Sequence, residues 1–268
     1  MIVTVNDQAA YCYTGGKAFD PAKPSAIFIH GAQNDHSVWG LQTRYFAHHG
    51  FNVLALDLPG HGRSKGAALT SVEAMANWVL ALMAAVGVDK ALLIGHSMGS
   101  LIALEASHQA PERVTALAML GTTYPMKVSD ALLASARDNE QDAVDMVTIF
   151  SHSTMAHKPS CPGPGFSVMG GARRLMQRMS AINPAQLFYT DFYACNAYAN
   201  GQQAAEGVRC PVLFIFGSKD MMTPPRSTKA LTGAIAHGQV IMVDAGHALM
   251  AEQPDAVLDA LYAFANRR

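Results

Sequence analysis

Ser97 stands at the centre of segment 95–99, which has the pattern G-x-S-x-G. An apolar run at 91–94 precedes this segment and a helix-like stretch at 100–110 follows it. The order predicts a strand, a tight turn and a helix, with the serine hydroxyl exposed at the strand's carboxyl end. The backbone N–H of Met98 starts the helix, where the helix dipole favours negative charge. We therefore expect a nucleophile and part of an oxyanion hole here.

A serine hydroxyl is a poor nucleophile at neutral pH and needs a base that takes its proton. His247 follows the apolar run 240–243, and Asp220 follows the apolar run 212–216. A carboxylate beside such a histidine orients the imidazole and stabilises its charged form. Open parallel sheets place their sites at the carboxyl ends of the strands, so all three side chains are expected at one edge. The chain order Ser, Asp, His, with each residue beyond a strand end, is a more specific signal of a catalytic serine than the pentapeptide alone.

Apolar runs alternate with helical patterns along most of the chain, which predicts a mostly parallel sheet covered on both faces. The residues around the turn signal Asn6-Asp7 predict an antiparallel hairpin at 2–5 and 9–13. The spacing of Thr70 and Glu73 predicts a helix that begins with Thr70 as its N-cap. The expected buried strands are 26–29, 53–57, 91–94, 114–120, 212–216 and 240–243.

The alternation stops after Gly121. Residues 122–207 show no clear buried strand, and helical patterns cover about 129–150, 171–179 and 184–200. We interpret 122–207 as a helical cap over the carboxyl edge of the sheet, and residues 1–121 and 208–268 as one α/β core domain.

The composition excludes several kinds of partner and cofactor. The chain has 19 lysines and arginines against 20 aspartates and glutamates, without a long run of like charge, so neither nucleic acid nor an anionic membrane is expected to bind. No stretch predicts a signal peptide or a membrane span. The cysteines lack metal spacing and no G-x-G-x-x-G follows the first buried strand, so we expect a cytoplasmic protein with reduced thiols and without metal or cofactor. The four cysteines are Cys12, Cys161, Cys195 and Cys210.

Five segments together resemble the α/β-hydrolase fold family over nearly the full chain. They are 30–31 (His-Gly), 57–64 (D-L-P-G-H-G-R-S), 95–99, 217–220 and 246–247 (Gly-His). The resemblance implies an eight-stranded type of sheet, with Ser97 as nucleophile, His247 as general base and Asp220 as the acid of the triad. It also implies an oxyanion hole from the N–H groups of Ala32 and Met98, and an acyl-enzyme that water hydrolyses.

Two questions about the site stay open at this stage. Asp57 competes with Asp220 for the role of acid, although in the family the aspartate of this motif looks structural. The cap supplies apolar side chains that suit an acyl or alcohol pocket, each of which packing alone also explains. The candidates for substrate binding are Phe166, Met169, Met176, Phe188 and Phe192.

These observations predict a serine hydrolase that acts on a small to medium carboxylic ester. The same triad serves a thioesterase, a lactonase, an acyltransferase or a perhydrolase with a different pocket or acceptor. A C–C bond hydrolase is disfavoured because such relatives carry G-N-S-M-G, whereas this chain has His96. Outside enzymes, the fold also hosts ligand receptors that keep the triad. The natural substrate and the oligomeric state are left open.

Overall fold

Eight strands form a single sheet in the order β1-β2-β4-β3-β5-β6-β7-β8. The computed structural model describes residues 1–153 and 168–266. β1 pairs antiparallel with β2, and β2 pairs antiparallel with β4, whereas all other neighbours are parallel. The strands are β1 (Ile2–Val5), β2 (Gln8–Tyr13), β3 (Ser25–Ile29), β4 (Asn52–Leu56), β5 (Ala91–His96), β6 (Val114–Leu120), β7 (Val212–Gly217) and β8 (Gln239–Val243). The predicted α/β fold with a mostly parallel, eight-stranded sheet is confirmed.

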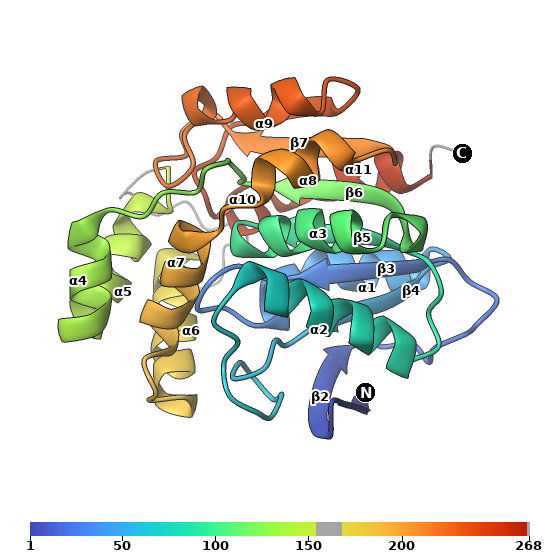
Figure 1. Cartoon of the computed structure of the whole chain (residues 1–268), viewed down its shortest axis with the longest axis horizontal. Coiled ribbons are helices and arrows are strands. Elements are labelled where there is room, and N and C mark those ends of the chain that lie inside the picture. Colours follow the sequence, from blue (N-terminus) through green and yellow to red (C-terminus); the bar gives the residue numbers. More distant parts are fainter. Residues whose placement is uncertain (154–167, 267–268) are drawn as a thin grey trace.

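Helices cover both faces of the sheet, which explains why its central strands are continuous apolar runs. Every residue of β3, β4, β5 and β7 is buried. The helices α2 (Val72–Ala85), α3 (Met98–Gln109), α8 (Gly201–Gly207) and α9 (Lys229–Ala234) pack on one face, and α1 (Gly40–His48), α10 (Leu249–Glu252) and α11 (Pro254–Ala265) pack on the other. Figure 1 shows α2 and α3 in front of the sheet and α1 behind it.

Helix α2 begins one residue later than the sequence pattern predicts. Ser71 is its N-cap, and the Ser71 hydroxyl accepts a hydrogen bond from the N–H of Ala74 at 3.2 Å. The prediction of Thr70 as the cap was therefore wrong. Two adjacent hydroxyl residues satisfy the same capping preference, and only the structure shows which of them makes the bond.

Four helices between β6 and β7 gather at the edge of the sheet toward which its parallel strands point (Figure 1). They are α4 (Asp130–Asp138), α5 (Glu140–Phe150), α6 (Val168–Ile182) and α7 (Leu187–Ala197). Their buried side chains form a cluster of their own, which includes Leu132, Val144 and Phe188. Helix α8, in contrast, packs against α3. The assignment of 122–207 as a cap remains a proposal, and α4 to α7 are called the cap helices below.

The part of the chain that the structure describes contains no helix that is both long and apolar enough to cross a membrane. Within the same residues Cys12, Cys195 and Cys210 are free thiols, and Cys161 lies outside them.

Candidate active site

Ser97 occupies the turn between β5 and α3 in a strained backbone conformation. Its φ is 52° and its ψ is −120°, a backbone region that residues other than glycine rarely adopt. The N–H of Ser97 donates to the carbonyl oxygen of Leu120 on β6 at 2.9 Å, which anchors the turn. A Cβ on Gly95 would overlap the carbonyl oxygen of Gly99. Gly95 therefore lets β5 and α3 approach closely, and Gly99 lets α3 approach the end of β3, where a Cβ would overlap the carbonyl oxygen of Ile29.

His247 and Asp220 meet at the same edge of the sheet. His247 Nδ1 lies 2.8 Å from Asp220 Oδ2, and both side chains are buried. The other bonds of the carboxylate are local: Oδ1 accepts from the N–H groups of Met222 and Thr223, and Oδ2 accepts from the Thr223 hydroxyl, each at 2.8 Å. Four hydrogen bonds thus fix the carboxylate in the orientation that holds the imidazole ring.

This environment keeps Asp220 ionised. Burial raises the pKa of Asp220, but the charge of His247 and the hydrogen bonds from His247 and Thr223 outweigh burial and hold the pKa of this carboxyl well below its usual range. Nothing in the sequence pattern indicated Thr223, because a threonine three residues after an aspartate is a common loop feature.

His96 and His30 flank the turn as neutral, structural groups. The Nε2–H of His96 donates to the carbonyl oxygen of His247 at 2.9 Å. Burial and the charge of nearby His247 lower the pKa of His96 to about 3. His30 Nδ1 bonds the carbonyl oxygen of Gly31 at 2.8 Å, and His30 Nε2 accepts from the N–H of Leu58 at 3.2 Å. Burial and the charge of neighbouring His61 lower the pKa of His30 to about 4.

The two backbone groups predicted for the oxyanion hole flank Ser97. A Cβ on Gly31 would lie 3.2 Å from Ser97 Cβ, so the loop that carries Ala32 runs directly beside the serine. Ala32 and Ser97 line the same cavity. Met98 is the first residue of α3, and an N–H at this position has no acceptor within its own helix.

Two cavities meet at Ser97. The larger, of about 380 Å³, extends toward α6 and α10, and the smaller, of about 270 Å³, extends toward the segment before α4. Most of their described lining is apolar, and neither an aspartate nor a glutamate is part of that lining. The described residues that line both cavities are Ala32, Ser97, Val147, Phe192, Met222 and His247.

The candidates for substrate binding divide by their place in the cap. Met176 lines the larger cavity, and Phe192 lines both. Phe188 is fully buried and stacks on Phe192 with ring centroids 4.7 Å apart, so it supports the cavity wall from behind. Met169 is half-buried on α6 and, like Phe188, is absent from the described lining of both cavities. Phe166 lies outside the described residues.

Asp57 holds loops together and does not contact His247 in any described hydrogen bond. Its Oδ1 accepts from the backbone N–H of His36 at 2.9 Å and lies 2.7 Å from His36 Nδ1, and its Oδ2 accepts from the N–H of Arg63 at 2.8 Å. Burial raises the pKa of Asp57, but these hydrogen bonds, of which that from the His36 side chain is the strongest, outweigh burial. The pKa of Asp57 is therefore below its usual value.

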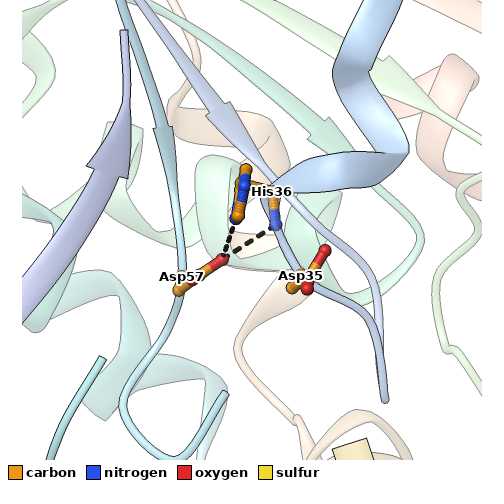
Figure 2. Close-up of side chains that lie close together, drawn as sticks. All are labelled: Asp35, His36 and Asp57. Carbon is orange, nitrogen blue, oxygen red and sulfur yellow. Dashed lines mark hydrogen bonds and ion pairs between the residues drawn. The ribbon is translucent and has the colours of Figure 1, made fainter. Parts of the chain in front are cut away.

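Asp35, His36 and Asp57 also form a group with donor atoms spaced for a metal ion (Figure 2). One donor atom from each residue lies within 4.8 Å of the others. Three of the four carboxylate oxygens already accept hydrogen bonds within the chain, since Asp35 Oδ1 caps the turn at Ser37 and both oxygens of Asp57 bond His36 or Arg63. The fourth, Asp35 Oδ2, has no hydrogen-bond partner among the described residues and lies 4.0 Å from Nη1 of Arg178. We assign this group to loop structure. No metal site was expected from the sequence, in which His36 and Asp57 are far apart.

Comparison with known proteins identifies relatives over most of the chain. The model of the alpha/beta hydrolase family matches residues 26–260. The (E)-2-((N-methylformamido)methylene)succinate hydrolase of Acinetobacter baylyi is 26% identical over 250 residues, which are 89% of this chain and 89% of that protein. The enol-lactonase of Burkholderia xenovorans LB400 superposes with a TM-score of 0.82 over 100% of both chains at 21% identity, which shows a common fold.

A longer relative matches an equal share of the chain. Protein ABHD8 of Bos taurus is 25% identical over 249 residues, which are 89% of this chain and 55% of that protein. This chain therefore spans about half the length of ABHD8.

Proposed function

Since this chain belongs to the alpha/beta hydrolase family, we propose that it is a serine hydrolase that cleaves small to medium carboxylic esters through an acyl-enzyme intermediate. One observation carries the proposal. The bond of 2.8 Å between His247 and Asp220 lies beside cavities that Ser97 and His247 line together. A nucleophile, a base and an orienting carboxylate are the minimum set for this chemistry.

In the proposed reaction, Ser97 Oγ attacks the ester carbonyl carbon while His247 Nε2 accepts the hydroxyl proton. Asp220 remains ionised and stabilises the imidazolium that forms. The N–H groups of Ala32 and Met98 donate to the oxyanion of the tetrahedral intermediate. When the intermediate collapses, the bond to the alcohol oxygen breaks and His247 gives its proton to that oxygen. Water then attacks the acyl-enzyme by the same sequence of proton transfers and releases the acid.

The size and apolar lining of the two cavities favour a small substrate with apolar groups on both sides of the scissile bond. The two cavities meet at Ser97, so one cavity is suited to the acyl group of the ester and the other to its alcohol group. Apolar lining from Val147, Met176 and Phe192 favours burial of hydrocarbon over recognition of charge. Reactions on thioesters and lactones need the same residues and differ in the shape of the bound group.

Turnover of p-nitrophenyl esters of graded acyl length tests the proposal. We expect activity that peaks at a short or medium acyl length and falls by about 10³-fold or more in Ser97→Ala. Ser107→Ala is the matched control, because Ser107 lies on the helix that follows Ser97, and among the described residues its hydroxyl bonds only the carbonyl oxygen of Leu104, at 2.7 Å. Full activity in Ser97→Ala would refute the assignment. Absence of ester turnover together with labelling of Ser97 by a fluorophosphonate would redirect the search to thioesters, lactones or acyl transfer.

A further inference from the structure

The residue after Ala32 is tied to the cap by a buried polar network. Gln33 is fully buried and has a φ of 56°. Its side-chain Nε2 donates to the Ser180 hydroxyl at 2.9 Å and to the carbonyl oxygen of Met176 at 3.2 Å, both on α6. The same nitrogen lies 3.2 Å from a carboxylate oxygen of Glu140 on α5. One core residue therefore joins two cap helices.

A third cap helix holds the backbone of the same residue. The N–H of Gln33 donates to Oδ2 of Asp191 on α7 at 2.8 Å, and the Asp191 side chain is fully buried. This N–H belongs to the peptide plane that begins at Ala32 Cα. A bond that fixes this plane fixes ψ of Ala32, and so restricts the residue whose own N–H is proposed to bind the oxyanion.

The charge of Asp191 is balanced from the core. His61 Nε2 lies 2.9 Å from Asp191 Oδ2, and His61 Nδ1 lies 3.1 Å from the carbonyl oxygen of Pro59. Both ring nitrogens face acceptors, so both donate when the ring is protonated. Burial lowers the pKa of His61, but the charge of Asp191 and its hydrogen bond outweigh burial and raise it.

Within the described residues the network pairs Asp191 Oδ2, whereas Asp191 Oδ1 and Gln33 Oε1 are buried without a hydrogen-bond partner. A buried carboxylate is destabilising unless an opposite charge and hydrogen bonds offset the loss of its hydration. A residue other than glycine is strained at positive φ, and such a conformation persists only where the surroundings impose it. His61 and the Gln33 N–H together satisfy Asp191 Oδ2, and in return Asp191 holds Gln33 in its left-handed conformation.

We propose that Asp191 is a positioning residue, which acts from cap helix α7 through the Gln33 N–H to aim the N–H of Ala32 at the oxyanion formed at Ser97. The proposal rests on the proposed function, because it assigns Asp191 to the oxyanion hole of that same reaction. It makes the cap part of the catalytic apparatus, in addition to its role as a wall of the cavities.

Asp191→Asn and Asp191→Ala test the catalytic consequence. We expect kcat for the best p-nitrophenyl ester to fall by about 10- to 100-fold while KM changes little, since a displaced oxyanion donor weakens transition-state binding. The matched control is Asn183→Ala, which removes a different contact between cap and core, from Asn183 Nδ2 to the carbonyl oxygen of Gly60 at 3.3 Å. Asp191→Asn keeps the side-chain shape and carries the test if Asp191→Ala does not fold.

Two results would overturn the positioning role. One is a fall in kcat that Asn183→Ala reproduces, and the other is a rise in KM with kcat unchanged. Either would show that Asp191 merely keeps the cap in place.

Hydrogen exchange at the amides of segment 31–35 gives a readout that is independent of the substrate. We expect faster exchange of the Gln33 amide in both Asp191 variants, and unchanged exchange in Asn183→Ala, because only the Asp191 variants disturb the acceptor of that N–H. Unchanged exchange in all three would refute the tether even if the wild-type protein hydrolyses esters. If the Asp191 variants exchange faster but the wild-type protein neither turns over esters nor reacts with a fluorophosphonate, the tether stands, and its catalytic role is refuted along with the proposed function.

Discussion

Two buried aspartates follow strand ends in this chain, and their hydrogen-bond partners separate their roles. Asp220 bonds the ring of His247, which lies beside Ser97 at the cavities. Asp57 bonds the ring and backbone of His36 and the backbone of Arg63. Both carboxyls have lowered pKa values, so the charge state does not distinguish them, and geometry does.

Asp220→Asn and Asp57→Asn separate the roles of the two carboxylates. We expect Asp220→Asn to lower kcat/KM for a p-nitrophenyl ester by about 10³- to 10⁴-fold, because an amide neither stabilises the imidazolium nor favours the required tautomer of His247. Asp57→Asn is expected to lower the urea midpoint of unfolding and to keep most of the activity per folded molecule. The opposite ranking of the two activities would transfer the acid role to Asp57.

Candidate site residues could be predicted from the sequence only where they belong to a recognisable motif. Ser97, Asp220 and His247 each follow a strand in a recognisable pattern, whereas the choice of cap residues relied on residue type alone. Phe188 and Phe192 are equally apolar and four positions apart on α7, yet only Phe192 reaches the described lining of the cavities. Which face of a cap helix meets the cavity depends on long-range packing, and Gln33 and Asp191 are joined across 158 positions by a contact without a local signature.

At the scale of elements, the turn at Ser97 depends on the close approach of β5 and α3. Gly95→Ala introduces a Cβ that would overlap the carbonyl oxygen of Gly99, an atom of the backbone that cannot rotate away. We expect a loss of about 1–3 kcal/mol in the free energy of unfolding, measured by urea titration, together with reduced reactivity of Ser97 toward a fluorophosphonate.

Gly233→Ala is the control for this substitution. Gly233 lies in α9 at an ordinary helical φ, and a Cβ there would meet no atom within 4 Å. Its replacement is expected to leave stability unchanged or to raise it by up to about 1 kcal/mol through helix propensity. Equal effects of Gly95→Ala and Gly233→Ala on stability would show that the close approach does not constrain the turn.

Strands were easier to predict than helix boundaries, for a physical reason. A strand buried on both faces must be apolar throughout, so β3 and β5 stand out as runs. The predicted helix at about 129–150 is in fact two, α4 and α5, which separate at Asn139, where φ is −151° and ψ is 81°. Asn139 is neither glycine nor proline, so its residue type does not mark the break, after which α5 packs against α4.

Across the whole molecule, folding shifts the pKa values of buried histidines in opposite directions. His30 and His96 are held neutral, with pKa values lowered to about 4 and about 3, whereas the pKa of His61 is raised by Asp191. The unfolded chain binds a proton at His30 and at His96 below about pH 6.5, and the native chain does not. These two residues therefore stabilise the fold above pH 6.5 and lose that contribution as the pH falls toward 4. His61 acts in the opposite sense, and its contribution is complete below pH 6.5 and is lost only as the pH rises.

Acid should consequently weaken the fold before the carboxylates titrate. Between about pH 6 and pH 4.5 the two neutral histidines give a slope of up to about 2.7 kcal/mol per pH unit in the free energy of unfolding, or about 1.4 from each. Urea titrations at several pH values in this window measure the slope. His30→Gln keeps a donor and an acceptor but does not titrate, so it should lower the slope by about half. A slope that is the same in His30→Gln and in wild type would mean that His30 is not buried as the neutral ring, and would contradict the hydrogen bond that its Nε2 accepts from Leu58.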